Sequence, residues 1–92
     1  MHAMVTVEFA PSLRRHVECA AQTVPRGSLR EVLEAALLAA PPLAHYVFDD
    51  QRSVRKHVAI FINQELVHDR TNLNQSLEAG AKVLVIQALS GG

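Results

Sequence analysis

The sequence predicts an α+β domain in which a mixed sheet of four or five strands carries one main helix across one face. Three observations lead to this fold. Strand-like segments with alternating apolar residues lie near both ends of the chain, a single strongly amphipathic helix lies between them, and the last strand is apolar at nearly every position. The 92 residues leave room for one domain with one modest core.

The composition excludes several classes of protein. Nine basic and nine acidic residues balance, whereas a nucleic-acid-binding domain normally carries a clear excess of positive charge. No apolar run approaches the roughly 20 residues that a membrane-spanning helix needs. The N-terminal residues also lack the cationic and apolar segments of a signal peptide. We therefore expect a cytoplasmic protein that binds neither nucleic acid nor membrane.

The first two strands are expected to form a hairpin. Residues 4–9 alternate, which places Val5, Val7 and Phe9 on one face. Residues 10–12 should interrupt the strand, and a second apolar run follows at residues 17–24. One face of this second strand would carry Val17, Cys19 and Ala21. Cys19 is the only cysteine, so no intramolecular disulfide is possible, and its predicted inner position favours an inert apolar side chain.

The main helix is predicted to begin directly after Ser28. Ser28 is a good N-cap and Glu31 follows at the spacing of a capping box. The prolines at 41 and 42 should end the helix. The apolar residues recur with helical period and form one stripe: Leu29, Val32, Leu33, Ala36, Leu37 and Ala40.

The second half of the chain should complete the sheet. Residues 43–48 could pack on the core before a loop at 49–51. The elements expected after that loop are a strand at 57–62, a turn at 63–64, a short strand at 65–68, a helical turn at 73–77, a turn at 78–81 and a last strand at 82–89. Placing the last strand beside the first gives the β-grasp (ubiquitin-like) arrangement. The domain would then span residues 1–89, with a flexible tail at 90–92.

The chain ends in Gly91-Gly92 directly after the last strand. Because glycine has no side chain, such a tail can enter a slot too narrow for a Cβ and present its carboxylate to a reactive group. A carboxylate becomes electrophilic only after activation, so this tail would need a partner that uses ATP. The alternatives are a frayed terminus without a role and a cloning scar.

Several segments resemble the MoaD/ThiS family of ubiquitin-like sulfur carriers, which end in Gly-Gly. The resemblance runs nearly end to end. The matching segments are residues 9–14, 29–33, 58–63 with Glu65, 77–80, 83–86 and 90–92. Two departures concern the branch of the family. Gln64 stands where a glycine is common in the turn, and residues 87–89 lack the proline that often precedes the tail.

The resemblance implies a carrier protein rather than an enzyme. A ubiquitin-activating-like adenylyltransferase would adenylate the Gly92 carboxylate, and ATP would be used by that partner, with no cofactor bound to the carrier. A sulfur donor protein or sulfide would then supply the sulfur of a thiocarboxylate. A sulfur-accepting synthase would finally take it for molybdopterin, thiamine, cysteine or a secondary metabolite.

The strand pattern also predicts a partner-binding surface. Val83 and Val85 should face the helix, which leaves Leu84 and Ile86 on the opposite face, together with Phe61. An exposed apolar patch of this kind would suit docking on the activating enzyme, with Leu89 and Ser90 forming the stalk of the tail. In the alternative, residues 43–50 cover these side chains.

Other interpretations remain open on the sequence alone. The five histidines have spacings unlike those of zinc sites, so no metal site is predicted. No nucleophile-elbow motif supports a Ser-His-Asp triad. The rival functions are a protein modifier joined to lysines, a small subunit of a molybdopterin-synthase-like complex, and a β-grasp interaction domain with an inert tail.

Overall fold

A computed structural model of the chain describes residues 3–15 and 19–87. It contains a five-stranded mixed sheet with the strand order β2-β1-β5-β3-β4. The strands are β1 (Met4–Phe9), β2 (Gln22–Pro25), β3 (Val58–Ile62), β4 (Glu65–Leu66) and β5 (Lys82–Gln87). The helices are α1 (Pro11–Arg14), α2 (Leu29–Leu37), the 3-10 helix η1 (Pro41–Leu43) and α3 (Ala44–Val47). The predicted sheet crossed by one main helix, α2, is confirmed.

The last strand is central, as its apolar sequence predicts. β5 runs parallel to β1 on one side and antiparallel to β3 on the other. β2 and β4 close the two edges through antiparallel pairs with β1 and β3. A strand with neighbours on both sides lies inside the sheet, where its backbone polar groups are hydrogen-bonded to both neighbours. An almost continuous apolar sequence is typical of such a strand. This order places the C-terminal end of β5 beside the C-terminal end of β1.

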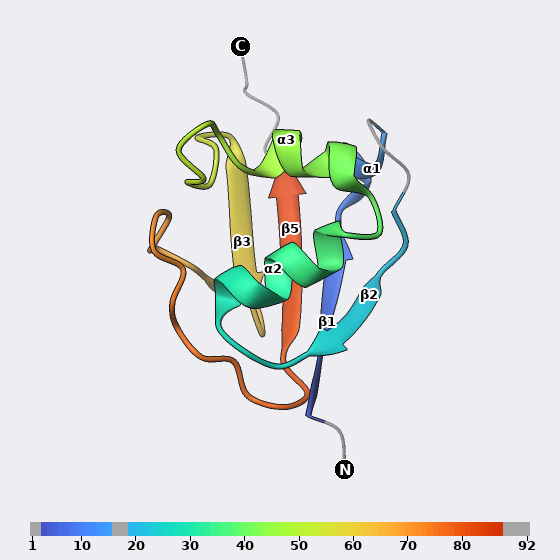
Figure 1. Cartoon of the computed structure of the whole chain (residues 1–92), viewed down its shortest axis with the longest axis vertical. Helices are drawn as coiled ribbons and strands as arrows, with labels where there is room; N and C mark the ends of the chain where they lie inside the picture. Colours follow the sequence, from blue (N-terminus) through green and yellow to red (C-terminus); the bar gives the residue numbers. More distant parts are fainter. Residues whose placement is uncertain (1–2, 16–18, 88–92) are drawn as a thin grey trace.

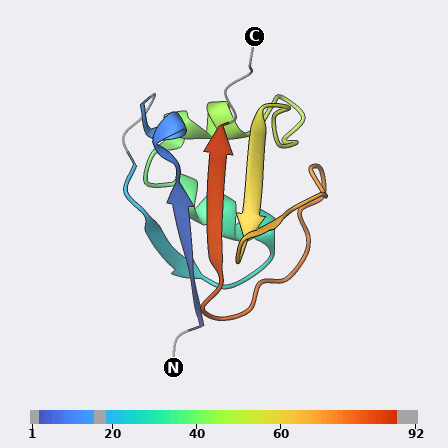
Figure 2. The ribbon, with the colours of Figure 1, turned by 180° about the vertical axis from the view of Figure 1, so that it is seen from behind.

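The domain has two layers, with the helices on one face of the sheet. α2, η1 and α3 lie in front of the strands in Figure 1, and the view from behind in Figure 2 shows β1, β5 and β3 with no helix covering them. The core fills the space between the layers. Its strand contribution consists of fully or almost fully buried side chains: Val5, Val7, Phe9, Val58, Ile60, Val83 and Val85.

The sequence of α2 explains both its start and its orientation. The Ser28 hydroxyl accepts a hydrogen bond from the Glu31 backbone N–H at 3.1 Å, and the Glu31 carboxylate accepts one from the Ser28 N–H at 2.9 Å. This is the predicted capping box. The predicted apolar stripe is buried along its whole length. The helix ends at Leu37, and the two prolines then open η1 rather than following the helix directly.

The segment after β4 was expected to contain a helical turn at residues 73–77, and this prediction is wrong. The segment contains no helical turn and runs along the start of α2, with Leu73 in the left-handed region at a φ of 54°. The Leu29 N–H donates to the Gln75 carbonyl at 2.9 Å, and the Arg30 N–H donates to the Leu73 carbonyl at the same distance. The first N–H groups of any α-helix lack partners within the helix. Here a non-helical segment supplies the partners, and this long-range pairing outweighs the weak local helical preference.

Two other predictions near the N-terminus need correction. Residues 10–12 do not simply interrupt the chain, because Pro11 begins α1; a proline suits a first helical position since its φ is already helical. The second strand is also shorter than predicted. β2 begins at Gln22, so Cys19 is buried outside a strand and Ala21 is exposed, while Val17 lies outside the described residues.

The predicted turns are present. Asn63 and Gln64 both have positive φ, at 49° and 75°, and connect β3 to β4, which is shorter than expected at two residues. The turn at 78–81 contains Gly80 at a φ of 84°, and the Ala81 N–H donates to the Glu78 carbonyl at 3.1 Å. A φ near 80° strains residues that carry a Cβ, which explains the glycine.

Candidate functional site

The predicted reacting group lies outside the described residues. Leu89, Ser90, Gly91 and Gly92 all follow Gln87, the last residue that the structure describes. The structure does describe the strand that leads to them, and this strand ends at a well-anchored point. The Gln87 N–H donates to the Ser12 hydroxyl at 3.2 Å, and the Ala10 N–H donates to the Val85 carbonyl at 2.9 Å. The start of α1 therefore fixes the point from which the tail continues.

The face of the sheet away from the helices, here called the outer face, carries the predicted apolar patch. Phe61 and Leu84 are cross-strand partners on β3 and β5, and Ile86 lies two residues further along β5. All three side chains are half-buried, in contrast to the buried Val83 and Val85, which alternate with Leu84 and Ile86 along β5. The alternation along β5 therefore matches the prediction. It points one set of residues into the core and the other set outward.

Residues 43–50 do not cover this patch, so that alternative is wrong. η1 and α3 lie on the helix side, where Leu43 and Val47 are buried, while Tyr46 remains exposed. The outer face instead contains a broad hollow of about 850 Å³. Its lining mixes apolar side chains of β3 and β5 with Thr6, Glu8, Asn63, Gln64 and Lys82. An apolar floor with charged groups at its margin is the usual anatomy of a protein interface.

Sequence reasoning missed part of the outer face. Glu8 pairs with Leu84 across the parallel β1–β5 ladder, and Leu66 pairs with Phe61 across β3 and β4. Glu8, Leu84, Phe61 and Leu66 thus form one row across the sheet, with Leu66 45% exposed. Alternation alone indicates that Glu8 faces away from Val7 and Phe9. Which residue lies beside it depends on the register between β1 and β5, which no local pattern determines.

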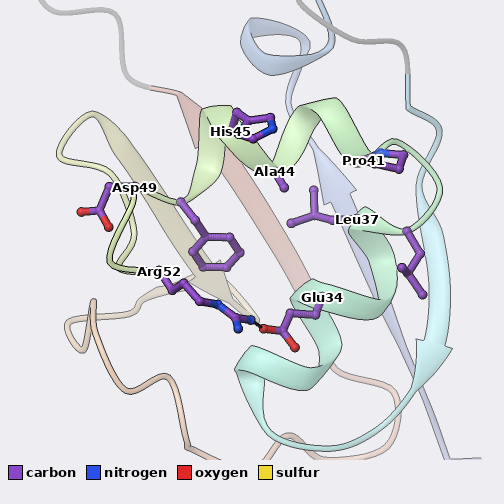
Figure 3. Close-up of a pocket in the computed structure, with 9 residues that line it drawn as sticks. Glu34, Leu37, Pro41, Ala44, His45, Asp49 and Arg52 are labelled. Atoms are coloured by element: carbon purple, nitrogen blue, oxygen red, sulfur yellow. Dashed lines mark hydrogen bonds and ion pairs between the residues drawn. The ribbon is translucent and has the colours of Figure 1, made fainter.

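A second hollow, of about 320 Å³, lies on the helix side between α2 and α3. Figure 3 shows it with Leu37, Pro41 and Ala44 along its wall and an ion pair between Arg52 and Glu34 at its lower end. Leu38 also lines it and is 78% exposed. None of its lining residues comes from β5, so this hollow lies on the opposite layer from the outer face.

One carboxylate has a shifted pKa for a structural reason. Asp69 accepts hydrogen bonds from the backbone N–H groups of Thr71, Asn72 and Leu73, at 2.9–3.1 Å. These bonds favour the charged form and lower the pKa of Asp69 below its ordinary value of 3.8. Arg30 binds the same loop by donating to the carbonyls of Thr71 and Asn72, and it also donates to the Arg52 carbonyl in the loop before β3. Asp69 therefore shapes the loop that packs against α2.

The remaining candidate groups do not assemble into a site. Within residues 3–15 and 19–87, no three His, Cys, Asp or Glu side chains lie close enough to hold a metal ion. His45, His57 and His68 lie on separate segments, and His2 and His16 fall outside the described residues. Cys19 is buried, as predicted. In the part of the chain that the structure describes, no helix is long and apolar enough to cross a membrane.

Comparisons with known structures agree with this architecture. SAMP1 from Haloferax volcanii superposes with a TM-score of 0.81 at 21% identity, over 97% of this chain and 99% of that one. The small archaeal modifier protein 1 of Methanosarcina acetivorans gives 0.78 at 20% identity, over 100% and 99% of the two chains. A chain of the BexX/CysO complex of Amycolatopsis orientalis gives 0.73 at 20% identity, over 96% and 99%.

The superpositions show the fold, and the family is shown by a match of the sequence to a family model. No curated protein matches the chain in a sequence search. The model of the ThiS family, in contrast, matches residues 13–92, which includes α2, the whole of β5 and the terminal Gly91-Gly92. The β-grasp sheet and this match together show that the chain belongs to the ThiS family, a family of ubiquitin-like sulfur carrier or modifier proteins.

Proposed function

We propose that this protein is a sulfur carrier whose reacting group is the Gly92 carboxylate. The observation that carries the proposal is the extent of the family match, which continues through the terminal glycines to residue 92. The fold supports it, since β5 leads directly from the centre of the sheet to the tail. Gly91 leaves the approach to the carboxylate without a side chain, so an enzyme can enclose the tail closely.

The chemistry has two steps, and both take place on a partner enzyme. A carboxylate oxygen of Gly92 attacks the α-phosphate of ATP and displaces pyrophosphate, which gives an acyl-adenylate. Hydrosulfide, from sulfide, then attacks the carbonyl carbon, and AMP leaves with the electron pair of the carbon–oxygen bond. The products are a thiocarboxylate and a proton. The carrier acts as a co-substrate of a ubiquitin-activating-like adenylyltransferase, and a sulfur-accepting synthase of a biosynthetic pathway consumes the thiocarboxylate.

We assign the outer face to docking on the activating enzyme. Phe61, Leu84 and Ile86 are half-exposed and belong to the apolar part of the lining of a hollow. This hollow is large enough to receive side chains of a partner. Leu84 and Ile86 lie on β5, which ends at Gln87, so an enzyme that binds them also fixes the position from which the tail continues. Leu89 and Ser90 are assigned to the stalk between this patch and the two glycines.

A specific observation also favours a second function. Three of the similar structures are of proteins named small archaeal modifier protein 1, or SAMP1. A modifier would pass its activated Gly92 carbonyl to a lysine amine and form an isopeptide bond instead of a thiocarboxylate. Both routes begin with the same adenylate, so the shape of the domain does not separate them. The product on Gly92 does.

The test is the intact mass of the protein after incubation with the activating enzyme of its host, ATP and sulfide. The carrier function predicts a mass increase equal to the exchange of one oxygen for sulfur, mapped to Gly92. A variant lacking Gly91 and Gly92 is the matched control and should not change. Lysine-linked adducts in place of this mass change support the modifier. If the mass does not change although the activating enzyme is demonstrably active, the carrier function is overturned.

A further inference from the structure

Two basic segments lie on either side of the end of β5. Residues 11–15 lie beside it, since Ser12 accepts the hydrogen bond of the Gln87 N–H. Residues 55–57 lie on the other side, because β3 starts at Val58 and Val58 pairs with Gln87. Figure 1 shows this arrangement, with α1 and the loop before β3 flanking the tip of the β5 arrow. The sheet topology therefore brings together two segments that are about 40 residues apart in sequence.

These two segments hold four permanent cations and no acid. The cations, here called the basic collar, are Arg14, Arg15, Arg55 and Lys56. The chain as a whole is neutral, so the rest of it carries a formal charge of −4. Four of the nine basic residues of the chain thus lie on the two segments that flank the end of β5, from which the tail continues. Such a charge distribution orients a protein as it approaches a charged partner.

The fold itself makes little use of the collar charges. The only ion pair between residues of 3–15 and 19–87 joins Arg52 to Glu34, so no carboxylate in this part of the chain neutralises the collar. Arg14 and Arg55 each donate one hydrogen bond to a backbone carbonyl, of Phe9 and His45 respectively. Arg15, Arg55 and Lys56 are exposed. Like charges that lie close together repel one another, so the stability of the fold does not explain why these cations are clustered.

We propose that the basic collar docks against an acidic protein surface at the entrance to the adenylation site of the activating enzyme. This proposal rests on the carrier function above. Five residues follow Gln87, and an extended chain of that length spans at most about 17 Å. An enzyme that receives Gly92 must therefore bring the rim of its active site close to the collar. Carboxylates on that rim would pair with cations that lack partners in the part of the carrier that the structure describes.

A nucleic acid is a poorer partner for the same charges. Single-stranded nucleic acids are usually held by aromatic side chains that stack on the bases, in addition to cations. Residues 11–15 and 55–57 contain no Phe, Tyr or Trp, and the chain as a whole carries no net positive charge. The collar is small and flanks the end of β5, which fits a protein rim better than an extended polyanion.

The test measures ATP–pyrophosphate exchange by the host's activating enzyme as a function of carrier concentration, at low and at high salt. In the double variant Arg15→Glu/Lys56→Glu we expect a KM at least about 10-fold higher at low salt, because rim charges act mainly on encounter, and a kcat close to that of the wild type. Raising the salt concentration should increase the wild-type KM and reduce the difference in KM between the wild type and the double variant. Both replaced side chains are exposed, so the melting temperature should stay the same.

The matched control is Arg26→Glu, an exposed cation at the opposite end of the sheet, whose N–H bonds to the Ala3 carbonyl. It should leave the KM unchanged. If the wild type supports exchange and the collar variant has the same KM, the collar proposal is wrong and the carrier function stands. If the wild-type protein supports no exchange with an activating enzyme that is demonstrably active, both the collar proposal and the carrier function are overturned. Loss of binding to single-stranded RNA, with an unchanged KM, assigns the collar to nucleic acid and also overturns the proposal.

Discussion

Leu84 and Val85 are neighbours on β5 that should respond oppositely to the same replacement by alanine. Val85 is completely buried. Its truncation removes two methyl groups worth about 1.5 kcal/mol in transfer and adds a cavity, for a total of about 2–3 kcal/mol. In a domain of this size we expect a melting temperature lower by roughly 8–20 °C. Leu84 is half-exposed on the outer face, so its truncation should cost the fold only about 1 kcal/mol.

The effect on activation should be the reverse. Leu84 lies at the centre of the outer-face row, between Glu8 and Phe61. A central apolar interface residue contributes about 1–3 kcal/mol, so Leu84→Ala should raise the KM in pyrophosphate exchange by roughly 5- to 150-fold. Val85→Ala should keep a nearly normal KM at temperatures where it is folded. Thermal unfolding followed by circular dichroism supplies the stability comparison.

Two results would refute this reasoning. If Leu84→Ala destabilises the fold as much as Val85→Ala, the assignment of the two side chains to opposite faces is wrong. If Leu84→Ala is as stable as expected and its KM equals that of the wild type, the outer face is not the docking surface. The second result would leave the fold and the tail chemistry untouched, because neither depends on which face the enzyme contacts.

Three further predictions concern the stability of the fold. Ser28→Ala removes half of the capping box and should lower the unfolding free energy by about 1 kcal/mol, measured by urea denaturation, with Ser76→Ala as a comparison serine outside the helix cap. Gln64→Gly should raise the melting temperature by several degrees, because a φ of 75° costs a side-chain-bearing residue about 1 kcal/mol; an unchanged or lower value contradicts the turn geometry. Asp69→Asn should lower stability at neutral pH. Since the folded state lowers the pKa of Asp69, its contribution is present above the ordinary value of 3.8 and disappears as the pH falls through the folded pKa. The stability difference between wild type and Asp69→Asn should therefore shrink in acid, and a difference that is constant with pH argues against the charged hydrogen bonds.

Local patterns in the sequence determined most of the secondary structure. The alternation of Val5, Val7 and Phe9 predicted a strand and its buried face, because successive side chains of a strand point to opposite sides. Ser28 and Glu31 predicted the start of α2, since the capping box needs only residues three positions apart. The terminal glycines predict a reactive carboxylate, which depends on the covalent structure of the last residues rather than on packing, and this stays a prediction because these residues lie outside the described part of the chain.

The tertiary structure decided what depends on contacts between distant residues. The non-helical path of residues 73–77 follows from hydrogen bonds to the first N–H groups of α2, which no local sequence pattern includes. The row from Glu8 to Leu66 depends on the registers of β5 with β1 and of β3 with β4. The basic collar depends on the parallel pairing of β1 with β5, which brings α1 to the end where β3 begins. Register and strand order arise from the packing of the whole core, so only the folded domain brings these charges together beside the end of β5.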